Sequence, residues 1–155
     1  MTQSPAILFV CLGNICRSPL AEGALRAAAG EVGLDLHVDS AGTGHWHVGN
    51  PPDERAQAVA LRHGVDISGL RARQVEEADF TRFTHIYALD SENLRNLRML
   101  SPFDASAELG LLLDAVPGRT GQAVADPYYG GDEGFLETWR DVTAAAAALV
   151  ARFRA

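Results

Sequence analysis

The sequence contains no lysine, so all 13 of its basic residues are arginines. This absence excludes a Schiff-base lysine, a pyridoxal-phosphate anchor and the lysine of a nucleotide-binding P-loop. The arginines stand against 20 acidic residues, which gives a formal net charge of -7. We therefore expect no general affinity for nucleic acid or for an anionic membrane surface.

Cysteine is also scarce, with only Cys11 and Cys16 present. Two cysteines so close together do not make a disulfide scaffold, and the paired Cys/His spacings of zinc sites are missing. The apolar run over residues 6–12 is too short for a signal-peptide core or a membrane span. We expect a cytoplasmic protein with no metal and no cofactor.

The size and composition predict one domain spanning residues 1–155, because 155 residues with 47% apolar content suffice for one core. Strand-forming runs lie at residues 6–10, 34–39, 85–89 and 109–116. Helical patterns lie at residues 18–30, 50–64, 91–100 and 133–154, the first three opened by the potential caps Ser18, Asn50 and Ser91. This alternation predicts an α/β three-layer sandwich, with a central four-stranded parallel sheet and helices on both faces.

Residues 11–18, with the sequence CLGNICRS, join the first predicted strand to the first predicted helix. A loop that curls into a helix N-terminus aims backbone N–H groups inward and forms a cradle for an anion. Cys11 lies at its entrance, where the amides and the helix dipole stabilise negative charge on sulfur. Arg17 adds a planar fork for two phosphate oxygens, and the Ser18 hydroxyl is placed to donate to the sulfur. The alternative is that Cys11 is a small buried residue and Arg17 a solvated charge.

Residues 10–19, VCLGNICRSP, resemble the signature loop of the low-molecular-weight protein tyrosine phosphatases. Residues 126–131, DPYYGG, are similar to the general-acid loop of that family, and they lie in the long loop before the last helix. Residues 39–42 and 90–94 also look like family segments. The resemblance therefore extends over nearly the whole chain.

The resemblance implies hydrolysis of phosphotyrosine, in a protein or a small aryl phosphate, through a phosphocysteine on Cys11. It implies that Arg17 and the loop hold the phosphate oxygens, and that Asp126 acts first as general acid and then as base. For Asp126 the alternative is a plain turn, which Asp-Pro often begins. The other implied substrate-binding residues of the loop are Leu12, Gly13, Asn14, Ile15, Cys16 and Ser18. The sequence indicates nothing about oligomeric state.

Asn14 is a residue type that tolerates positive φ in a tight loop. The resemblance adds hydrogen bonds that link Asn14, Ser18 and Ser40 and support the loop. The chain departs from the family at Leu70, where many relatives carry a histidine that joins this network. We expect less support on that side and an activity that survives at a reduced level.

Trp46, Tyr128 and Tyr129 are candidates for the aromatic walls of a slot for phenyl phosphate, as the resemblance favours. The alternative is that Trp46 is packing and the tyrosines are ordinary loop residues. His45 and His47 flank Trp46, and we interpret them as solvated loop residues because their spacing alone does not make a metal site.

Cys16 is either a small packed residue or a partner that captures oxidised Cys11 in a reversible disulfide. Two other functions remain open. A thioredoxin-coupled arsenate reductase shares the cradle but needs further cysteines downstream, which this chain lacks. A phosphate-binding or phosphocarrier module keeps the cradle without turnover, whereas Arg17 together with Asp126 favours hydrolysis.

Overall fold

The computed structural model describes residues 4–128 and 130–154. Its four strands form one parallel sheet in the order β2-β1-β3-β4, so β1 lies in the interior. All six residues of β1 are buried, as expected for a strand covered on both faces. The strands are β1 (Ala6–Cys11), β2 (His37–Gly42), β3 (His85–Ala88) and β4 (Glu108–Leu111).

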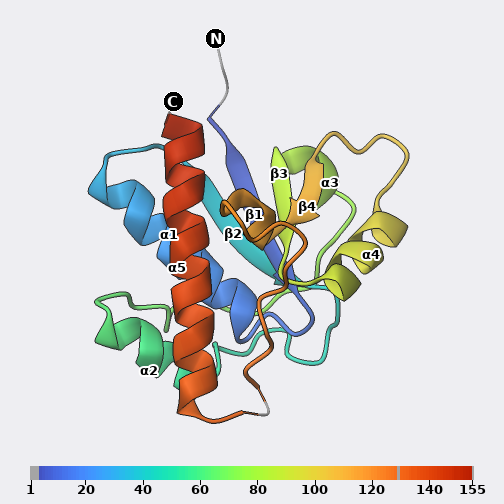
Figure 1. Ribbon diagram of the computed structural model, residues 1–155. Helices are drawn as coiled ribbons and strands as arrows, with labels where there is room; N and C mark the ends of the chain where they lie inside the picture. The colour runs from blue at the N-terminus through green and yellow to red at the C-terminus, as the bar shows by residue number, and fades with distance from the viewer. Residues whose placement is uncertain (1–3, 129, 155) are drawn as a thin grey trace.

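Helices cover both faces of this sheet (Figure 1). Alternate residues of β1 pack into two hydrophobic clusters, one around α1, α2 and α5 and the other around α3 and α4. The predicted three-layer α/β sandwich is therefore confirmed. The helices are α1 (Arg17–Glu31), α2 (Glu54–Arg62), α3 (Asp79–Arg82), α4 (Ser91–Leu100) and α5 (Asp132–Arg154). None of them, within the described ranges, is long and apolar enough to cross a membrane.

Several predicted boundaries are wrong because pairing between strands overrides local pattern. The second strand was expected at residues 34–39, but β2 pairs with β1 from His37, opposite Ala6, to Gly42, opposite Cys11. The fourth strand ends at Leu111 and continues as a single 3-10 turn, η1 (Leu112–Ala115). The four-residue helix α3 has no counterpart among the predicted elements.

The three predicted caps, Ser18, Asn50 and Ser91, are also wrong. Asp53 caps α2 by accepting the Arg55 N–H, and Asp90 caps α4 by accepting the Asn93 N–H. α1 begins at Arg17, after Cys16, whose side chain makes no capping bond. Ser18 lies inside the helix, where its hydroxyl is used for another contact.

Gly42, at the end of β2, touches the loop that follows β1. A Cβ atom on Gly42 would lie 2.7 Å from the Leu12 carbonyl oxygen and 3.2 Å from the Gly13 carbonyl carbon. Both are backbone atoms, so a side chain at position 42 fits only if the loop moves. Gly42 therefore fixes how closely residues 12–14 approach the sheet.

We expect Gly42→Ala to lower the free energy of unfolding by about 1–3 kcal/mol, as overpacking against backbone does. Urea unfolding measures this change. Gly110→Ala in β4 is the matched control, because a Cβ there meets nothing within 4 Å. An equal loss in both variants would show that close approach of the loop is not the cause.

Candidate active site

The loop between β1 and α1 curls around the sulfur of Cys11. Asn14 has φ 58°, the one positive φ among the described non-glycine residues, and its N–H donates to Cys11 Sγ at 3.3 Å. The Ser18 hydroxyl lies 2.9 Å from the same sulfur. The predicted backbone conformation of Asn14 is confirmed, and Ser18 contacts Cys11 as expected.

The side chain of Asn14 holds this turn in place with three hydrogen bonds. Its Nδ2 donates to Ser18 Oγ at 2.8 Å and to Ser40 Oγ at 3.0 Å. Its Oδ1 accepts the Arg73 N–H at 3.0 Å. These contacts tie the loop to α1, to β2 and to the segment after α2, and they include the links that the family resemblance implies.

Ser40 has a charged partner although Leu70 offers no polar side chain. Its hydroxyl donates to Oε1 of buried Glu22 at 2.7 Å, and Arg26 donates to the other Glu22 oxygen at 2.9 Å. Burial raises the pKa of Glu22, while the contacts with Ser40 and Arg26 oppose that rise. Leu70 itself packs against the core. Glu22 is thus a supporting residue that sequence reasoning missed, and the reduced activity expected from Leu70 stays a prediction.

The Arg17 guanidinium is buried and held from two sides. Its Nη1 donates to Asp90 Oδ2 at 2.7 Å and to the Val124 carbonyl at 2.9 Å. The site prediction did not include Asp90, although the family-like segment 90–94 begins with it. Two fixed acceptors on one nitrogen restrain the guanidinium, and its Nη2 lies 3.8 Å from Asp126 Oδ2.

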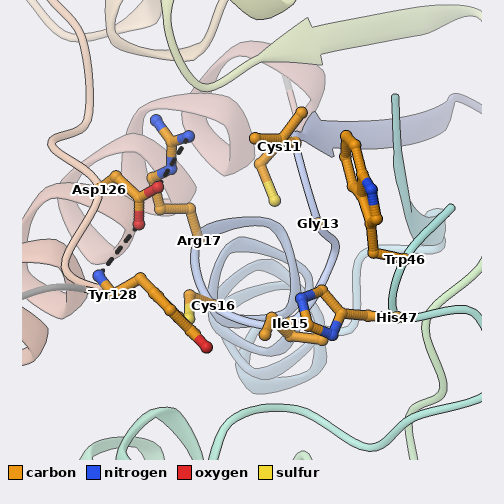
Figure 2. Close-up of a pocket in the computed structure, with 10 residues that line it drawn as sticks. Cys11, Gly13, Ile15, Cys16, Arg17, Trp46, His47, Asp126 and Tyr128 are labelled. Carbon is orange, nitrogen blue, oxygen red and sulfur yellow. Dashed lines mark hydrogen bonds and ion pairs between the residues drawn. The ribbon is translucent and has the colours of Figure 1, made fainter. Parts of the chain in front are cut away.

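Cys11 and Arg17 line a pocket of about 290 Å³ at the carboxyl end of the sheet, whereas Asn14 and Ser18, which were also predicted to bind substrate, are not among its lining residues. Trp46 and Tyr128, two of the three aromatic residues predicted as walls, lie on opposite sides of it (Figure 2), and their binding of a phenyl ring stays a prediction. Tyr129, the third predicted aromatic, lies outside the described residues. The pocket is lined by Cys11, Leu12, Gly13, Ile15, Cys16, Arg17, Trp46, His47, Asp126 and Tyr128.

The two histidines beside Trp46 differ in position. His45 is exposed and stacks on the Trp46 ring, with centroids 5.7 Å apart. His47 is half-buried and lines the pocket against Gly13, where a Cβ would lie 3.1 Å from the imidazole. His47 thus lines the pocket, which the interpretation as a solvated loop residue did not anticipate. No group of three or more potential metal ligands occurs in the part of the chain that the structure describes.

Asp126 both begins a turn and faces the pocket. Its Oδ1 accepts the Tyr128 N–H at 3.0 Å, which is the turn expected of Asp-Pro. Its carboxylate remains partly exposed and lies beside the Arg17 guanidinium (Figure 2). The two interpretations of Asp126 are therefore compatible.

Arg55, at the start of α2, holds the Asp126 loop from the other side. Its guanidinium donates to the carbonyls of Tyr128 at 2.9 Å and Gly130 at 3.1 Å, and it lies 4.6 Å from the Phe135 ring centroid. The Asp53 carboxylate orients it through hydrogen bonds. Partial burial opposes ionisation, yet the bonds from Arg55 hold the pKa of Asp53 below its usual value. No local sequence signal marks the contact of Arg55 with the Asp126 loop, because the two carbonyls that it binds are more than 70 positions away.

Cys16 is buried beside the same pocket. Burial, followed by the charges of Asp53, Cys11 and Asp126, raises the pKa of its thiol far above the usual value. The environment of Cys16 therefore favours the thiol over the thiolate.

Comparison with known proteins identifies the family. Residues 6–155 match the family described as low molecular weight phosphotyrosine protein phosphatase. The low molecular weight protein-tyrosine-phosphatase YfkJ of Bacillus subtilis is 46% identical over 129 residues, which cover 82% of this chain and 83% of that protein. The crystal structure of YfkJ superposes with a TM-score of 0.91 at 40% identity, covering 99% of this chain and 96% of that one.

A more distant solved structure, the Drosophila arginine phosphatase DARP, has a TM-score of 0.91 at 29% identity, covering 96% of this chain and 98% of that one. The fold, the loop and these relatives agree. The chain therefore belongs to the low molecular weight phosphotyrosine protein phosphatase family and is a phosphoric monoester hydrolase, as its protein-tyrosine-phosphatase relatives are.

Proposed function

We propose that this chain hydrolyses phosphotyrosine and related aryl phosphates through a covalent phosphocysteine on Cys11. The observation that carries the proposal is the position of the Cys11 sulfur inside a loop that donates to it, beside a restrained Arg17. Asp126 lies across the mouth, within 3.8 Å of the same guanidinium. A nucleophile, an anion-binding group and a proton donor thus converge on one pocket.

In the first step the Cys11 thiolate attacks phosphorus, and the P–O bond to the phenol breaks in line with the attack. Arg17 and the amides of residues 12–17 bind the equatorial oxygens, where negative charge must be stabilised. Protonated Asp126 donates its proton to the leaving oxygen.

In the second step Asp126, now ionised, takes a proton from water that attacks the phosphocysteine. The sulfur leaves as a thiolate, and the Ser18 hydroxyl at 2.9 Å stabilises it by hydrogen bonding. Phosphate is released and the enzyme returns to its starting state.

The pocket walls favour an aryl phosphate. Leu12, Ile15, Trp46 and Tyr128 provide apolar and aromatic surface around the entrance, which suits a flat phenyl ring. Asp126 is the one carboxylate among the lining residues, so a phosphorylated guanidine, the substrate class in the name of the Drosophila relative, has no second acidic partner. Hydrolysis of phosphotyrosine in preference to phosphoarginine is the expected selectivity.

We expect Cys11→Ser to lose roughly a thousandfold or more of the wild-type kcat on p-nitrophenyl phosphate, because the covalent step is removed. Asp126→Ala keeps the nucleophile and should lose about a hundredfold or more, the usual contribution of a general acid. Steady-state assays with and without EDTA measure both effects. A wild type without turnover, or turnover that EDTA abolishes, contradicts the proposal and leaves the phosphate-binding or reductase alternatives.

We expect Arg55→Met to slow hydrolysis of phenyl phosphate about tenfold while p-nitrophenyl phosphate is less affected, because a poor leaving group depends more on a well-placed acid. The reason is that Arg55 positions the Asp126 loop through two carbonyls. Arg62→Met, on the same helix, is the matched control and should leave both rates unchanged. Equal slowing of both substrates by Arg55→Met would assign Arg55 a merely structural role.

We expect mild peroxide to join Cys11 and Cys16, which line one pocket. Peroxide oxidises the Cys11 sulfur to a sulfenic acid, and the Cys16 sulfur then displaces water to form the disulfide. Dithiothreitol should restore activity in the wild type but not in Cys16→Ser. Mass spectrometry that finds sulfinic acid on Cys11 and no linkage to Cys16 overturns this role.

A further inference from the structure

A second hollow, of about 280 Å³, adjoins the active-site pocket. Leu12 and Trp46 line both of them, so the Trp46 side chain and the start of the loop stand between the two. The rest of the second hollow comes from the turn after β2 and from the end of α4. Its lining residues are Leu12, Thr43, Gly44, Trp46, Asn96, Met99 and Leu100.

The Trp46 indole separates the two hollows, and it is held in place by packing. A Cβ on Gly44 would lie 1.9 Å from Trp46 Cζ3, so the ring packs directly over the glycine backbone. His45 stacks on the indole as well. The partition thus has packing partners although 66% of Trp46 is exposed.

The α4 side of the second hollow carries apolar side chains that are exposed to solvent. Leu94 and Leu97 of the same helix are buried in the core, whereas Met99 is 78% and Leu100 47% exposed. Because Met99 and Leu100 are exposed, they do not contribute to the core. Exposed apolar side chains grouped around a hollow, with the basic Arg95 and Arg98 exposed on the same helix, are typical of a recognition surface.

We propose that this second hollow binds an apolar side chain of the substrate protein, close in sequence to the phosphotyrosine. This inference rests on the proposed function. When the phosphotyrosine ring lies between Trp46 and Tyr128, the peptide main chain crosses the mouth of the pocket beside Trp46. An extended peptide advances about 3.3 Å per residue, so a residue within about three positions passes the indole and reaches the hollow.

The two hollows share Leu12 and Trp46 as lining residues, and this adjacency makes part of the substrate the expected occupant of the second hollow. An apolar side chain contacts Trp46, Met99 and Leu100 while the phosphotyrosine occupies the first pocket. Burial of one such side chain removes apolar area from water in the transition state as well as in the bound state, so it raises kcat/KM. Small aryl phosphates end at the first pocket and gain nothing from the second.

The test is a set of phosphotyrosine peptides in which leucine replaces serine at one position at a time, from three before to three after the phosphotyrosine. The wild type should show kcat/KM raised about tenfold by leucine at one or two of these positions. The double variant Met99→Ser/Leu100→Ser should lose this preference, while its activity on the all-serine peptide and on p-nitrophenyl phosphate stays unchanged. Met99→Ser alone, at the more exposed position, should lose part of it.

Leu61→Ser is the matched control, because Leu61 is a leucine on α2 whose exposed fraction (65%) lies between those of Leu100 and Met99 and which lines neither hollow. It should retain the full preference. Equal kcat/KM for leucine and serine at every position in the wild type overturns the subsite, and a preference that survives the double variant overturns its assignment to this hollow. Absence of turnover on every substrate instead contradicts the proposed function itself.

Discussion

The whole site depends on the positive φ of Asn14. Asparagine tolerates the left-handed region better than most residues other than glycine, and the surroundings of Asn14 hold it there. Three side-chain hydrogen bonds do so, reaching Ser18, Ser40 and the Arg73 backbone. The same turn aims the Asn14 N–H at Cys11 Sγ. The turn that closes the loop therefore also places a donor on the sulfur.

A chain with a net negative charge repels a phosphate dianion on average, so groups close to the bound phosphate must provide the attraction. In the proposed mechanism the buried Arg17 provides this attraction. The acidic Asp90 assists, because it fixes Arg17 Nη1 and leaves the remaining donors of the planar fork available. A lysine could not be restrained in this way, because its ammonium is a point charge on a flexible stem. The net charge of -7 is then a weak, salt-screened background, whereas the guanidinium acts at contact distance.

Local sequence was sufficient wherever chemistry lies in contiguous residues. The strand, the cradle and the helix of residues 6–31 follow from neighbouring residue types, and so do Cys11, Arg17 and Ser18. Prediction failed where distant segments meet. Arg55 acts on carbonyls at positions 128 and 130, and His47 faces Gly13. Ser18 is a residue type that often caps helices, but it lies inside α1, and its hydroxyl contacts the nearby Cys11 sulfur instead. β2 shifted by three residues because β1 sets its register.

The residues around the pocket form a buried group and an exposed group, and replacing a residue has different consequences for stability in the two groups. Asn14, Ser18, Ser40 and Glu22 are buried and share hydrogen bonds, so a change in one leaves another buried polar group unpaired. Trp46, Met99 and Leu100 are exposed, so they can change without such a penalty. The exposed positions are therefore free to vary while the loop stays intact. The Drosophila structure, at 29% identity, keeps the fold at a TM-score of 0.91 and is named for another phosphorylated residue, so the shared fold does not by itself fix the substrate.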